Sequence, residues 1–314
     1  MARRFVVLGS GMAGLTTARR LADAGHDVVV LDKGRHPGGR MATDDLAGGA
    51  RADKGAQFFT VRSRGLADGV DRWAADGLVH EWCRGFGTDD GHSRFAVTGG
   101  MARLPAHLAE GLDVRQSVNV AAVEPVSGGW SVRWPAGHGS SAGVLLCDAV
   151  VVTAPVPQAA LLLGDGVDAP DLRYDATLSL VLALDGPPSV PAPGGVQLTG
   201  DPVWSWVGDN QAKGVSAVPS VTLHTTAAVA TARWDDDRTM LTADLIDAAG
   251  PWLGDADVVD AHLHRWRYAT PAEPHPERCL EVAPGLVLAG DAFGGPRVEG
   301  AYLSGLAAAE ALGA

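Results

Sequence analysis

The stretch Phe5-Val6-Val7-Leu8-Gly9-Ser10-Gly11-Met12-Ala13-Gly14 decides the fold of this 314-residue chain. Its first four residues are apolar, as in a short strand that is buried on both faces of a parallel sheet. Apolar residues then recur at helical spacing over residues 15–24 and a glycine follows at position 25, so we predict a helix that ends there. A second apolar run, residues 28–31, ends on Asp32. Strand, glycine turn, helix, strand and acid together form the fingerprint of a dinucleotide-binding domain.

Each part of this fingerprint has a mechanical role. Gly9 permits the tight turn, Gly11 allows the backbone to approach a pyrophosphate, and Gly14 allows the helix to pack closely on the strand. The N-terminus of the helix offers unpaired amide groups and a partial positive charge to that pyrophosphate. Asp32 is placed to accept hydrogen bonds from an adenosine ribose. We therefore predict the following cofactor-binding residues: Gly9, Ser10, Gly11, Met12, Ala13, Gly14, Asp32 and Lys33.

Composition limits the classes of function. The length favours two domains, and 46% hydrophobic with 20% charged residues is typical of a soluble globular protein. A net charge of −12 without a basic block argues against nucleic acid and anionic membranes as partners. Cys83, Cys147 and Cys279 are far apart and lack metal-ligand spacing, which predicts reduced thiols, no bound metal and a cytoplasmic protein. Because the apolar runs are short, we expect no export signal and no membrane span.

A second glycine doublet follows the second predicted strand, in Gly38-Gly39-Arg40-Met41-Ala42-Thr43. A simple NAD-binding domain has no evident need for this doublet. Proteins that bind FAD with this type of domain do carry one, where glycines admit the cofactor and an arginine neutralises its phosphates. We therefore predict that Gly39, Arg40 and Met41 contact FAD, with an ordinary glycine loop as the alternative.

Four motifs are spread over nearly the whole chain: GGRMAT at 38–43, DKGAQFFTVR at 53–62, HRWRYATP at 264–271 and LAGDAFGGPRVEGAYLSG at 288–305. In these motifs the sequence resembles the bacterial renalase-like FAD-dependent oxidoreductases, which are relatives of the flavin-containing amine oxidases. The resemblance implies that Gln57, Phe58 and Phe59 lie in a flavin-contact segment and that the backbone near Val120 pairs with adenine. The sequence departs from the family at Lys213-Gly214-Val215-Ser216, where a lysine-proline-glycine-arginine run is common.

The end of the chain is predicted to return to the cofactor. The apolar run 285–289 ends in Gly290-Asp291, which fits flavoproteins in which this aspartate bonds the ribityl chain. Residues 297–300 then open a final helix, whose N-terminus would stabilise negative charge on reduced flavin. Residues 290–305 contain no cysteine, so we predict noncovalent binding. The predicted FAD contacts in the later parts of the chain are Val120, Ala154, Gly290, Asp291, Glu299, Gly300 and Ala301.

The predicted fold is α/β: a Rossmann-like FAD-binding domain with a parallel sheet, and an inserted substrate domain with an antiparallel sheet, as in two-domain p-hydroxybenzoate-hydroxylase-like flavoproteins. We predict FAD-binding segments at 1–62, 97–157 and 277–314, and substrate-domain segments at 63–96 and 158–276. Helices are expected over 63–75 and 239–253, and an alternating strand over 177–184. Trp204 and Trp206 are expected to share one strand face.

Candidate substrate contacts come from side-chain chemistry. We predict that Arg62, Trp206, His224, Trp266 and Tyr268 contact a small-molecule substrate, with Gln57 and His224 as catalytic candidates. The alternatives are that the tryptophans are core residues and that the histidine is structural. No Ser/His/Asp triad or paired-carboxylate motif is identifiable, which agrees with a cofactor that carries the difficult step.

The resemblance implies oxidation of misreduced dihydronicotinamides, the 2- and 6-dihydro isomers of NAD(P), with dioxygen reduced to hydrogen peroxide. An amine oxidase or a desaturating oxidase of a small metabolite is one alternative. An NAD(P)H-dependent flavin monooxygenase is a second, and an FAD-holding protein without turnover is a third. We make no prediction of the oligomeric state.

Overall fold

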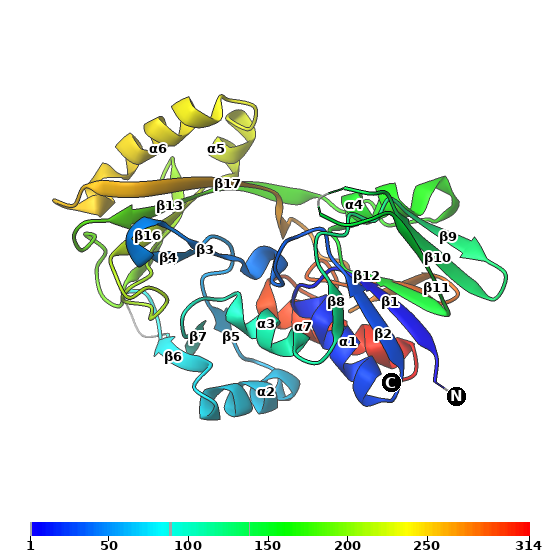
Figure 1. Cartoon of the computed structure of the whole chain (residues 1–314). Coiled ribbons are helices and arrows are strands. Elements are labelled where there is room, and N and C mark those ends of the chain that lie inside the picture. Colours follow the sequence, from blue (N-terminus) through cyan, green and yellow to red (C-terminus); the bar gives the residue numbers. More distant parts are fainter. Residues whose placement is uncertain (1, 88–89, 138) are drawn as a thin grey trace. The chain divides into compact units, whose positions relative to one another are not determined.

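The computed structural model describes residues 2–87, 90–137 and 139–314, and the chain divides into two compact units (Figure 1). Unit 1 comprises Met1–Gly39, Pro105–Arg173 and Pro271–Ala314, and unit 2 comprises Arg40–Leu104 and Tyr174–Thr270. Residues 40–62, which we predicted to belong with the FAD-binding segments, thus lie in unit 2. They lie there because backbone carbonyls of this segment accept hydrogen bonds from Ser220 and Thr222 of the sheet in unit 2. The assignment of cofactor and substrate binding to the two units stays a prediction.

Unit 1 is built on a six-stranded sheet in the order β18-β19-β12-β1-β2-β8. The strands are β1 (Arg4–Leu8), β2 (Asp27–Leu31), β8 (Asp113–Arg115), β12 (Ala149–Val152), β18 (Leu280–Ala283) and β19 (Leu286–Leu288). All neighbours are parallel except β18, which is antiparallel to β19. Val6 lies opposite both Val29 and Val150, and the central strands are apolar throughout because both faces of the sheet are covered. The predicted parallel sheet is confirmed.

Two helices from opposite ends of the chain lie side by side against this sheet (Figure 1): α1 (Met12–Asp23) and α7 (Arg297–Ala311). Small residues allow the close approach, since a Cβ on Gly305 would overlap the carbonyl oxygen of Ala13. The hydroxyl of Thr17 also donates to the Gly305 carbonyl at 3.0 Å. The first and last segments of the chain therefore share one core, which includes Phe5, Val7, Ala18, Leu21, Val30, Val151, Val287 and Ala308.

The middle segment of unit 1 adds a small antiparallel sheet in the order β11-β10-β9. Its strands are β9 (Ala122–Val126), β10 (Gly129–Trp134) and β11 (Gly143–Cys147). Helix α4 (Val156–Leu163) follows β12, and the short helix η3 (Gly164–Gly166) follows α4. Helix α3 (Arg103–Ala109) spans a boundary between the units.

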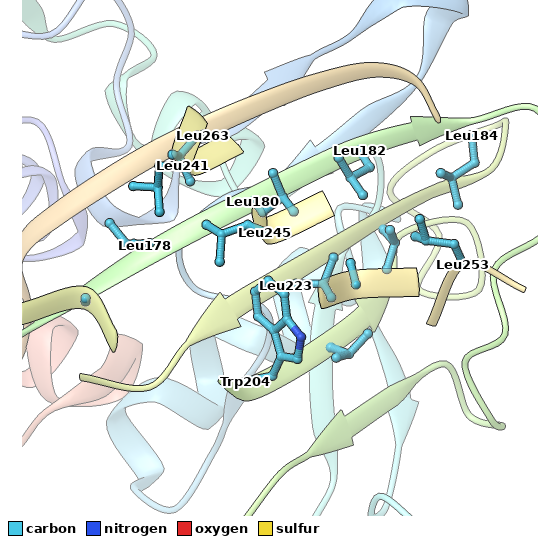
Figure 2. Close-up of a cluster of buried hydrophobic side chains, with 14 residues drawn as sticks. Leu178, Leu180, Leu182, Leu184, Trp204, Leu223, Leu241, Leu245, Leu253 and Leu263 are labelled. Atoms are coloured by element: carbon cyan, nitrogen blue, oxygen red, sulfur yellow. The ribbon is translucent and has the colours of Figure 1, made fainter. Parts of the chain in front are cut away.

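Unit 2 contains a five-stranded sheet in the order β14-β15-β16-β13-β17. The strands are β13 (Tyr174–Leu184), β14 (Gly195–Gln197), β15 (Trp204–Asp209), β16 (Ser220–Thr225) and β17 (Val258–Pro271). Helices α5 (Ala227–Ala232) and α6 (Arg238–Leu253) cover one face. Figure 2 shows the alternate leucines of β13, from Leu178 to Leu184, gathered with Leu241, Leu245 and Leu253 of α6. The predicted strand is confirmed, but the expectation that it is half-buried is wrong, because residues 178–184 are buried on both faces.

The opposite face of this sheet packs against the hairpin of β3 (Thr43–Asp45) and β4 (Arg51–Asp53). Here Val181 and Ala183 of β13 contact Leu46, Ala50 and Ala52. The short helices η1 (Gly39–Met41) and η2 (Ala47–Gly49) flank β3. A further sheet in the order β5-β7-β6 consists of β5 (Phe59–Thr60), β6 (Val79–Cys83) and β7 (Arg94–Val97), and helix α2 (Arg64–Ala75) precedes β6.

The two predicted helices of unit 2 are confirmed, and both begin at a side-chain cap. The Ser63 hydroxyl accepts from the Leu66 amide at the start of α2, and the Asp237 carboxylate accepts from the amides of Thr239 and Met240 at the start of α6. Predicted and observed bounds agree within one residue at each end.

The predicted common face of Trp204 and Trp206 is wrong. A β-bulge separates them, because Trp204 lies opposite Thr225 whereas Trp206 lies opposite His224, the next residue. The extra residue, Ser205, reverses the alternation of side chains along β15. Trp204 therefore joins the leucine core beneath α6, and Trp206 lies on the other face of the sheet with His224.

Two helical glycines provide a test of this packing. A Cβ on Gly14 in α1 would overlap the carbonyl oxygen of Gly9, whereas a Cβ on Gly250 in α6 would meet no atom within 4 Å. We expect Gly14→Ala to lower the free energy of unfolding by about 1–3 kcal/mol. We expect Gly250→Ala to change it by less than about 1 kcal/mol, because the helix preference of alanine is opposed by crowding between its Cβ and the following Pro251. Urea unfolding measures both, and a Gly14→Ala protein as stable as the wild type would contradict the packing.

Candidate functional site

The glycine turn between β1 and α1 has no room for a side chain at Gly9. Gly9 has a φ of +113°, which favours glycine, and a Cβ there would overlap the hydroxyl of Thr153. Gly11 is the N-cap of α1 and provides no side-chain hydrogen bond to the helix. The first amides of α1, beginning with Met12 and Ala13, are therefore available to an anion.

Asp32 lies at the end of β2 and its carboxylate is fixed by the glycine turn. Its Oδ2 accepts hydrogen bonds from the Ser10 amide (2.5 Å) and the Ser10 hydroxyl (2.8 Å), and its Oδ1 accepts one from the Gly34 amide (2.6 Å). A carboxylate offers about four acceptor positions, so these three bonds leave capacity for a ribose hydroxyl. The predicted ribose contact of Asp32 fits this geometry.

Gln116 belongs to the same hydrogen-bonded group and was not predicted from the sequence. Its Nε2 donates to the Ser10 hydroxyl at 3.1 Å, while its buried Oε1 has no hydrogen-bond partner among the described residues. An orphaned buried acceptor beside Asp32 fits a ligand that brings a donor, as the adenosine part of FAD does. Its position could have indicated it, because Gln116 follows β8 at the carboxyl end of a parallel strand, where ligands bind in this fold.

A second helix N-terminus lies at the other end of the chain. After β19, Gly290 adopts a φ of +136° and its amide donates to the Ser304 hydroxyl at 2.8 Å. Helix α7 then starts after Pro296 without a side-chain cap, which leaves its first amides available to negative charge. A Cβ on Gly300 would overlap the Gly295 carbonyl, so this turn also requires glycine.

The predicted residues of this second turn lie together. Asp291 directly follows Gly290, and Glu299, Gly300 and Ala301 form the first turns of α7. Asp291 and Glu299 both have interaction partners within the protein. Unit 1 thus presents a fixed carboxylate, an orphaned acceptor and two uncapped helix N-termini, which fit the hydroxyls and the anionic groups of FAD.

The remaining predicted cofactor residues are placed as follows. The Lys33 side chain is exposed, with Nζ 3.4 Å from the Gln158 carboxamide. Val120 lies between β8 and β9, and Ala154 lies between β12 and α4. Their contacts with FAD stay predictions.

The chain passes from unit 1 to unit 2 directly after the second glycine doublet, between Gly39 and Arg40. Gly39 has a φ of +55°. The guanidinium of Arg40 donates to the carbonyls of Tyr268 (3.2 Å) and Ala269 (3.3 Å) on β17, and Met41 is buried. Arg40 thus fixes the start of its segment to β17 within unit 2, and its predicted phosphate contact stays a prediction.

A buried ion pair organises unit 2. Lys213 and Asp53 are both fully buried, with Nζ 3.1 Å from Oδ2. The other carboxylate oxygen, Oδ1, accepts from the Thr43 hydroxyl (2.6 Å) and the Met101 amide (2.8 Å). Burial lowers the pKa of Lys213, and the charge of Asp53 opposes this shift. No local sequence pattern indicates this pair, because the two residues are 160 positions apart.

Gln57, a predicted catalytic residue, has its carboxamide engaged in this network. Its Oε1 accepts from Lys213 Nζ at 2.8 Å, and its Nε2 donates to the carbonyls of Asp53 (2.6 Å) and Gly55 (3.0 Å). The side chain is 6% exposed. These contacts favour a role in holding the segment that contains Phe58 and Phe59.

His224, the other predicted catalytic residue, is kept neutral. Burial, with a smaller effect of the positive charge of Lys213, lowers the pKa of His224 to about 4, although a hydrogen bond with the Lys54 backbone opposes this shift. Its Nε2 is buried and has no partner in the part of the chain that the structure describes. At pH 7 His224 therefore offers a neutral imidazole, which is a weak base.

Trp266 and Tyr268 lie on β17. The indole Nε1 of Trp266 donates to the Lys54 carbonyl at 2.8 Å, so Trp266 and His224 both contact the backbone of Lys54. The ring of Tyr268 lies edge-on to the ring of Tyr174, with centroids 5.6 Å apart. The structure thus brings together His224 and Trp266 of the predicted substrate residues.

Trp206 lies in a packed aromatic cluster and is 6% exposed. Its ring centroid is 4.9 Å from that of Phe86, 5.6 Å from that of Phe58 and 6.3 Å from that of Trp82. These contacts favour the alternative that Trp206 is a core residue.

Phe59 is buried and stacks on Phe95. Arg62 is exposed after β5 and has an interaction partner within the protein.

The hydrogen-bonded group at Gln116 can be tested by ligand affinity. We expect Gln116→Leu to raise the Kd of the apoprotein for FAD by about 5- to 10-fold, the equivalent of one net hydrogen bond. ADP shares only the adenosine and pyrophosphate parts, so its Kd should rise by the same factor. Flavin fluorescence titration and displacement by ADP measure the two constants. Gln197→Leu removes an exposed glutamine of unit 2 and should change neither constant. Unchanged ADP binding by Gln116→Leu would refute the assignment.

The low pKa of His224 predicts a pH dependence of stability. In the unfolded chain the pKa of this imidazole is near 6.5, whereas in the folded protein it is about 4. The unfolded chain therefore binds a proton first, so the free energy of unfolding falls as the pH decreases from 6.5 toward 4. We expect a loss of up to about 1.4 kcal/mol per pH unit from His224 in this window. Urea unfolding at pH 7 and pH 5 should show a smaller loss for His224→Asn than for the wild type. His264, whose pKa burial also lowers to about 4, contributes equally to both proteins. Parallel pH profiles would contradict the assignment.

The described residues do not meet the requirements of a membrane-spanning helix or of a three-ligand metal site. Within residues 2–87, 90–137 and 139–314, no helix is long and apolar enough to cross a membrane. In the same ranges, no group of three His, Cys, Asp or Glu side chains is arranged to hold a metal ion.

Short segments of the chain are similar to curated proteins. The chain is 48% identical over 59 residues to a hydroxyneurosporene desaturase of Rubrivivax gelatinosus, which covers 19% of this chain and 11% of that protein. It is 49% identical over 41 residues to an L-amino-acid oxidase of Daboia russelii, which covers 13% of this chain and 8% of that protein. The chain thus matches about a tenth of the length of these relatives.

Solved structures match the whole fold at low identity. A putative protoporphyrinogen oxidase of Exiguobacterium sp. 255-15 superposes with a TM-score of 0.74 and 14% identity, covering 99% of both chains. A putrescine oxidase superposes with a TM-score of 0.68 and 14% identity, also covering 99% of both chains. These likenesses show that the α/β fold with its Rossmann-like sheet is shared.

Family models match nearly the whole chain. The model of an NAD(P)-binding Rossmann-like domain matches residues 7–72, which contain the glycine turn and Asp32. The model described as flavin containing amine oxidoreductase matches residues 68–313, which contain the ion pair partner Lys213, His224 and α7. Since this second match covers most of the sequence, the chain belongs to the flavin-containing amine oxidoreductase family and is a flavin-dependent oxidoreductase.

Proposed function

We propose that the protein is an FAD-dependent oxidase that takes hydride from a small reduced substrate and passes the electrons to dioxygen. The observation that carries the FAD assignment is the combination in unit 1 of two uncapped helix N-termini, α1 and α7, with the fixed carboxylate of Asp32. Bound FAD supplies the hydride acceptor that dioxygen can reoxidise. We also propose noncovalent binding, a cytoplasmic location and a two-domain p-hydroxybenzoate-hydroxylase-like arrangement.

In this proposal the two turns of unit 1 have separate roles. Asp32 and Ser10 hold the adenosine end, and the first amides of α1 meet the pyrophosphate. Asp291 holds the ribityl chain, while the first amides of α7 stabilise the negative charge that reduction places on the flavin. Gln57 and Lys213 hold their segment in place and leave the hydride transfer to the substrate and cofactor.

The first candidate substrate is a misreduced dihydronicotinamide, the 2- or 6-dihydro isomer of NAD(P). Such a ring becomes aromatic by losing hydride alone, so its oxidation needs no protein base. The overall reaction combines the hydride, one proton and dioxygen to give the oxidised nucleotide and hydrogen peroxide. His224, with a pKa of about 4, is a weak base, and the carboxylate of Asp53 is held by Lys213, Thr43 and Met101. These features suit a donor that brings no proton to remove.

An amine oxidase or a desaturating oxidase is the second candidate. It is favoured by the names of similar proteins, which include a desaturase, an L-amino-acid oxidase and a putrescine oxidase. An ammonium substrate must lose a proton before it can give hydride. The low pKa of His224 makes it a weak base, which favours the dihydronicotinamide over this alternative.

Anaerobic mixing of the FAD-loaded enzyme with 2- or 6-dihydro-NAD, ordinary NADH and a panel of amines tests the proposal. We expect an isomer to bleach the flavin absorbance at least 100-fold faster than NADH, since the resemblance to renalase-like oxidoreductases implies the isomers as donors. Admission of air should then restore the absorbance and release one equivalent of hydrogen peroxide.

The other outcomes identify the alternatives. Bleaching by an amine alone would support the second candidate and contradict the first. If NADH bleaches the flavin and a second substrate makes this bleaching faster, the protein is a monooxygenase. A protein that no donor bleaches would overturn the oxidase proposal and indicate FAD binding without turnover.

A further inference from the structure

Polar side chains on the face of the five-stranded sheet that packs against β4 are almost all hydrogen-bonded. The Ser220 hydroxyl donates to the Arg51 carbonyl at 2.7 Å. The Thr222 hydroxyl donates to the Asp53 carbonyl at 2.9 Å and accepts from the side-chain Nδ2 of Asn210 at 3.0 Å. This pairing is expected, because a buried polar group without a partner destabilises the folded protein.

Three side chains on this face, Ser179, His224 and Trp206, depart from the pattern, because each has a buried polar atom without a hydrogen-bond partner in the described residues. The first two are neighbours. Ser179 on β13 lies directly opposite His224 on β16, so their side chains are adjacent on the same face. Ser179 is fully buried, and its hydroxyl has no hydrogen-bond partner among residues 2–87, 90–137 and 139–314. The buried Nε2 of His224 has none in the same ranges. Two adjacent orphaned groups on a face where most polar groups are paired indicate a place that a ligand completes.

The chemistry of the two groups defines the ligand. The imidazole is neutral, and one side of it is engaged with the Lys54 backbone, which leaves Nε2 as an acceptor. The Ser179 hydroxyl is a donor. A primary carboxamide has the complementary pair, an N–H donor and a carbonyl acceptor. A carboxylate has no donor for Nε2. An ammonium group could donate both to Nε2 and to the lone pairs of the hydroxyl oxygen, but it has no acceptor for the hydroxyl proton.

The surroundings suit a planar ring that carries this group. Trp266 shares the Lys54 carbonyl with His224, and its indole is fixed there by a 2.8 Å hydrogen bond. Its ring lies 4.0 Å from the ring of His264, centroid to centroid. Flat aromatic faces of this kind bind planar rings by stacking or edge contact.

We propose that Ser179 and His224 form a subsite that binds the primary carboxamide of the substrate ring, with the Ser179 hydroxyl donating to the carbonyl and the His224 Nε2 accepting from the amide. This subsite rests on the proposed function, because the dihydronicotinamide is the substrate class that carries such a group. It adds selection for the amide over the acid form of the same ring.

Calorimetry of the FAD-loaded enzyme with oxidised NAD and with its nicotinic acid analogue tests the subsite without turnover. The wild type should bind the amide at least 10-fold more tightly than the acid, because the acid leaves Nε2 unpaired. Ser179→Ala and His224→Leu should each weaken amide binding by about 5- to 10-fold and acid binding by less than 2-fold.

A matched serine separates binding from stability. Ser220→Ala removes a paired hydroxyl on the same face, so it should lower the melting temperature and leave the amide preference unchanged. Ser179→Ala removes an orphaned hydroxyl, so it should leave the melting temperature of the ligand-free protein equal to or above that of the wild type. Equal binding of amide and acid by the wild type, no binding of either, or the same loss in Ser220→Ala as in Ser179→Ala would each overturn the subsite.

The proposed function can fail independently. If no dihydronicotinamide bleaches the flavin while the amide preference and its loss in Ser179→Ala are observed, the carboxamide subsite stands and the oxidase reaction is wrong. If bleaching occurs and the amide preference is absent, the reaction stands and the subsite is wrong.

Discussion

The rest of unit 2 depends on the buried ion pair between Asp53 and Lys213. Removing two charges from water costs several kcal/mol for each ion, and only excellent geometry with additional hydrogen bonds offsets this cost. The protein supplies them, since Thr43 and Met101 bond Oδ1 while Gln57 bonds the ammonium. The pair therefore connects β4, the turn after β15 and the Gln57 segment. Loss of one partner would leave a charge buried without compensation, so these three segments hold their positions together.

The same pair determines the electrostatics of the neighbouring sheet face. The Lys213 charge adds to burial in keeping His224 neutral, and Asp53 is engaged by its own partners and unavailable as a base. A buried charge in low dielectric acts over several ångströms, so an ion pair formed for structural reasons also sets the proton affinity of its neighbours. Neutrality at His224 is thus a consequence of packing, and it is the property that favours a hydride donor needing no base.

Features that depend on local sequence were predictable, whereas those set by distant partners were not. The glycine turn, Asp32 and the caps of α2 and α6 are read from spacing within a few residues. The partners of Gln116 and Gln57 are 106 and 156 residues away, and no local pattern specifies such contacts. The orphaned hydroxyl of Ser179 depends on the register of β13 with β16. The bulge beside Ser205 adds one residue to a strand, which an alternating pattern does not reveal.

The orphaned groups have a common energetic meaning in the two units. Gln116 in unit 1 and Ser179 with His224 in unit 2 each leave a buried polar atom unpaired in the described part of the chain, although neighbouring polar groups are paired. Apolar residues of similar volume at these positions would avoid the cost of an unpaired group. The hydroxyls of Ser220 and Thr222 on β16 each donate to a backbone carbonyl. Hydrogen-bond partners can therefore be provided for polar side chains on this face. A loss of folding stability at single positions is typical of sites formed for a ligand. The same argument therefore supports both the proposed adenosine contact of Gln116 and the proposed substrate contacts of Ser179 and His224.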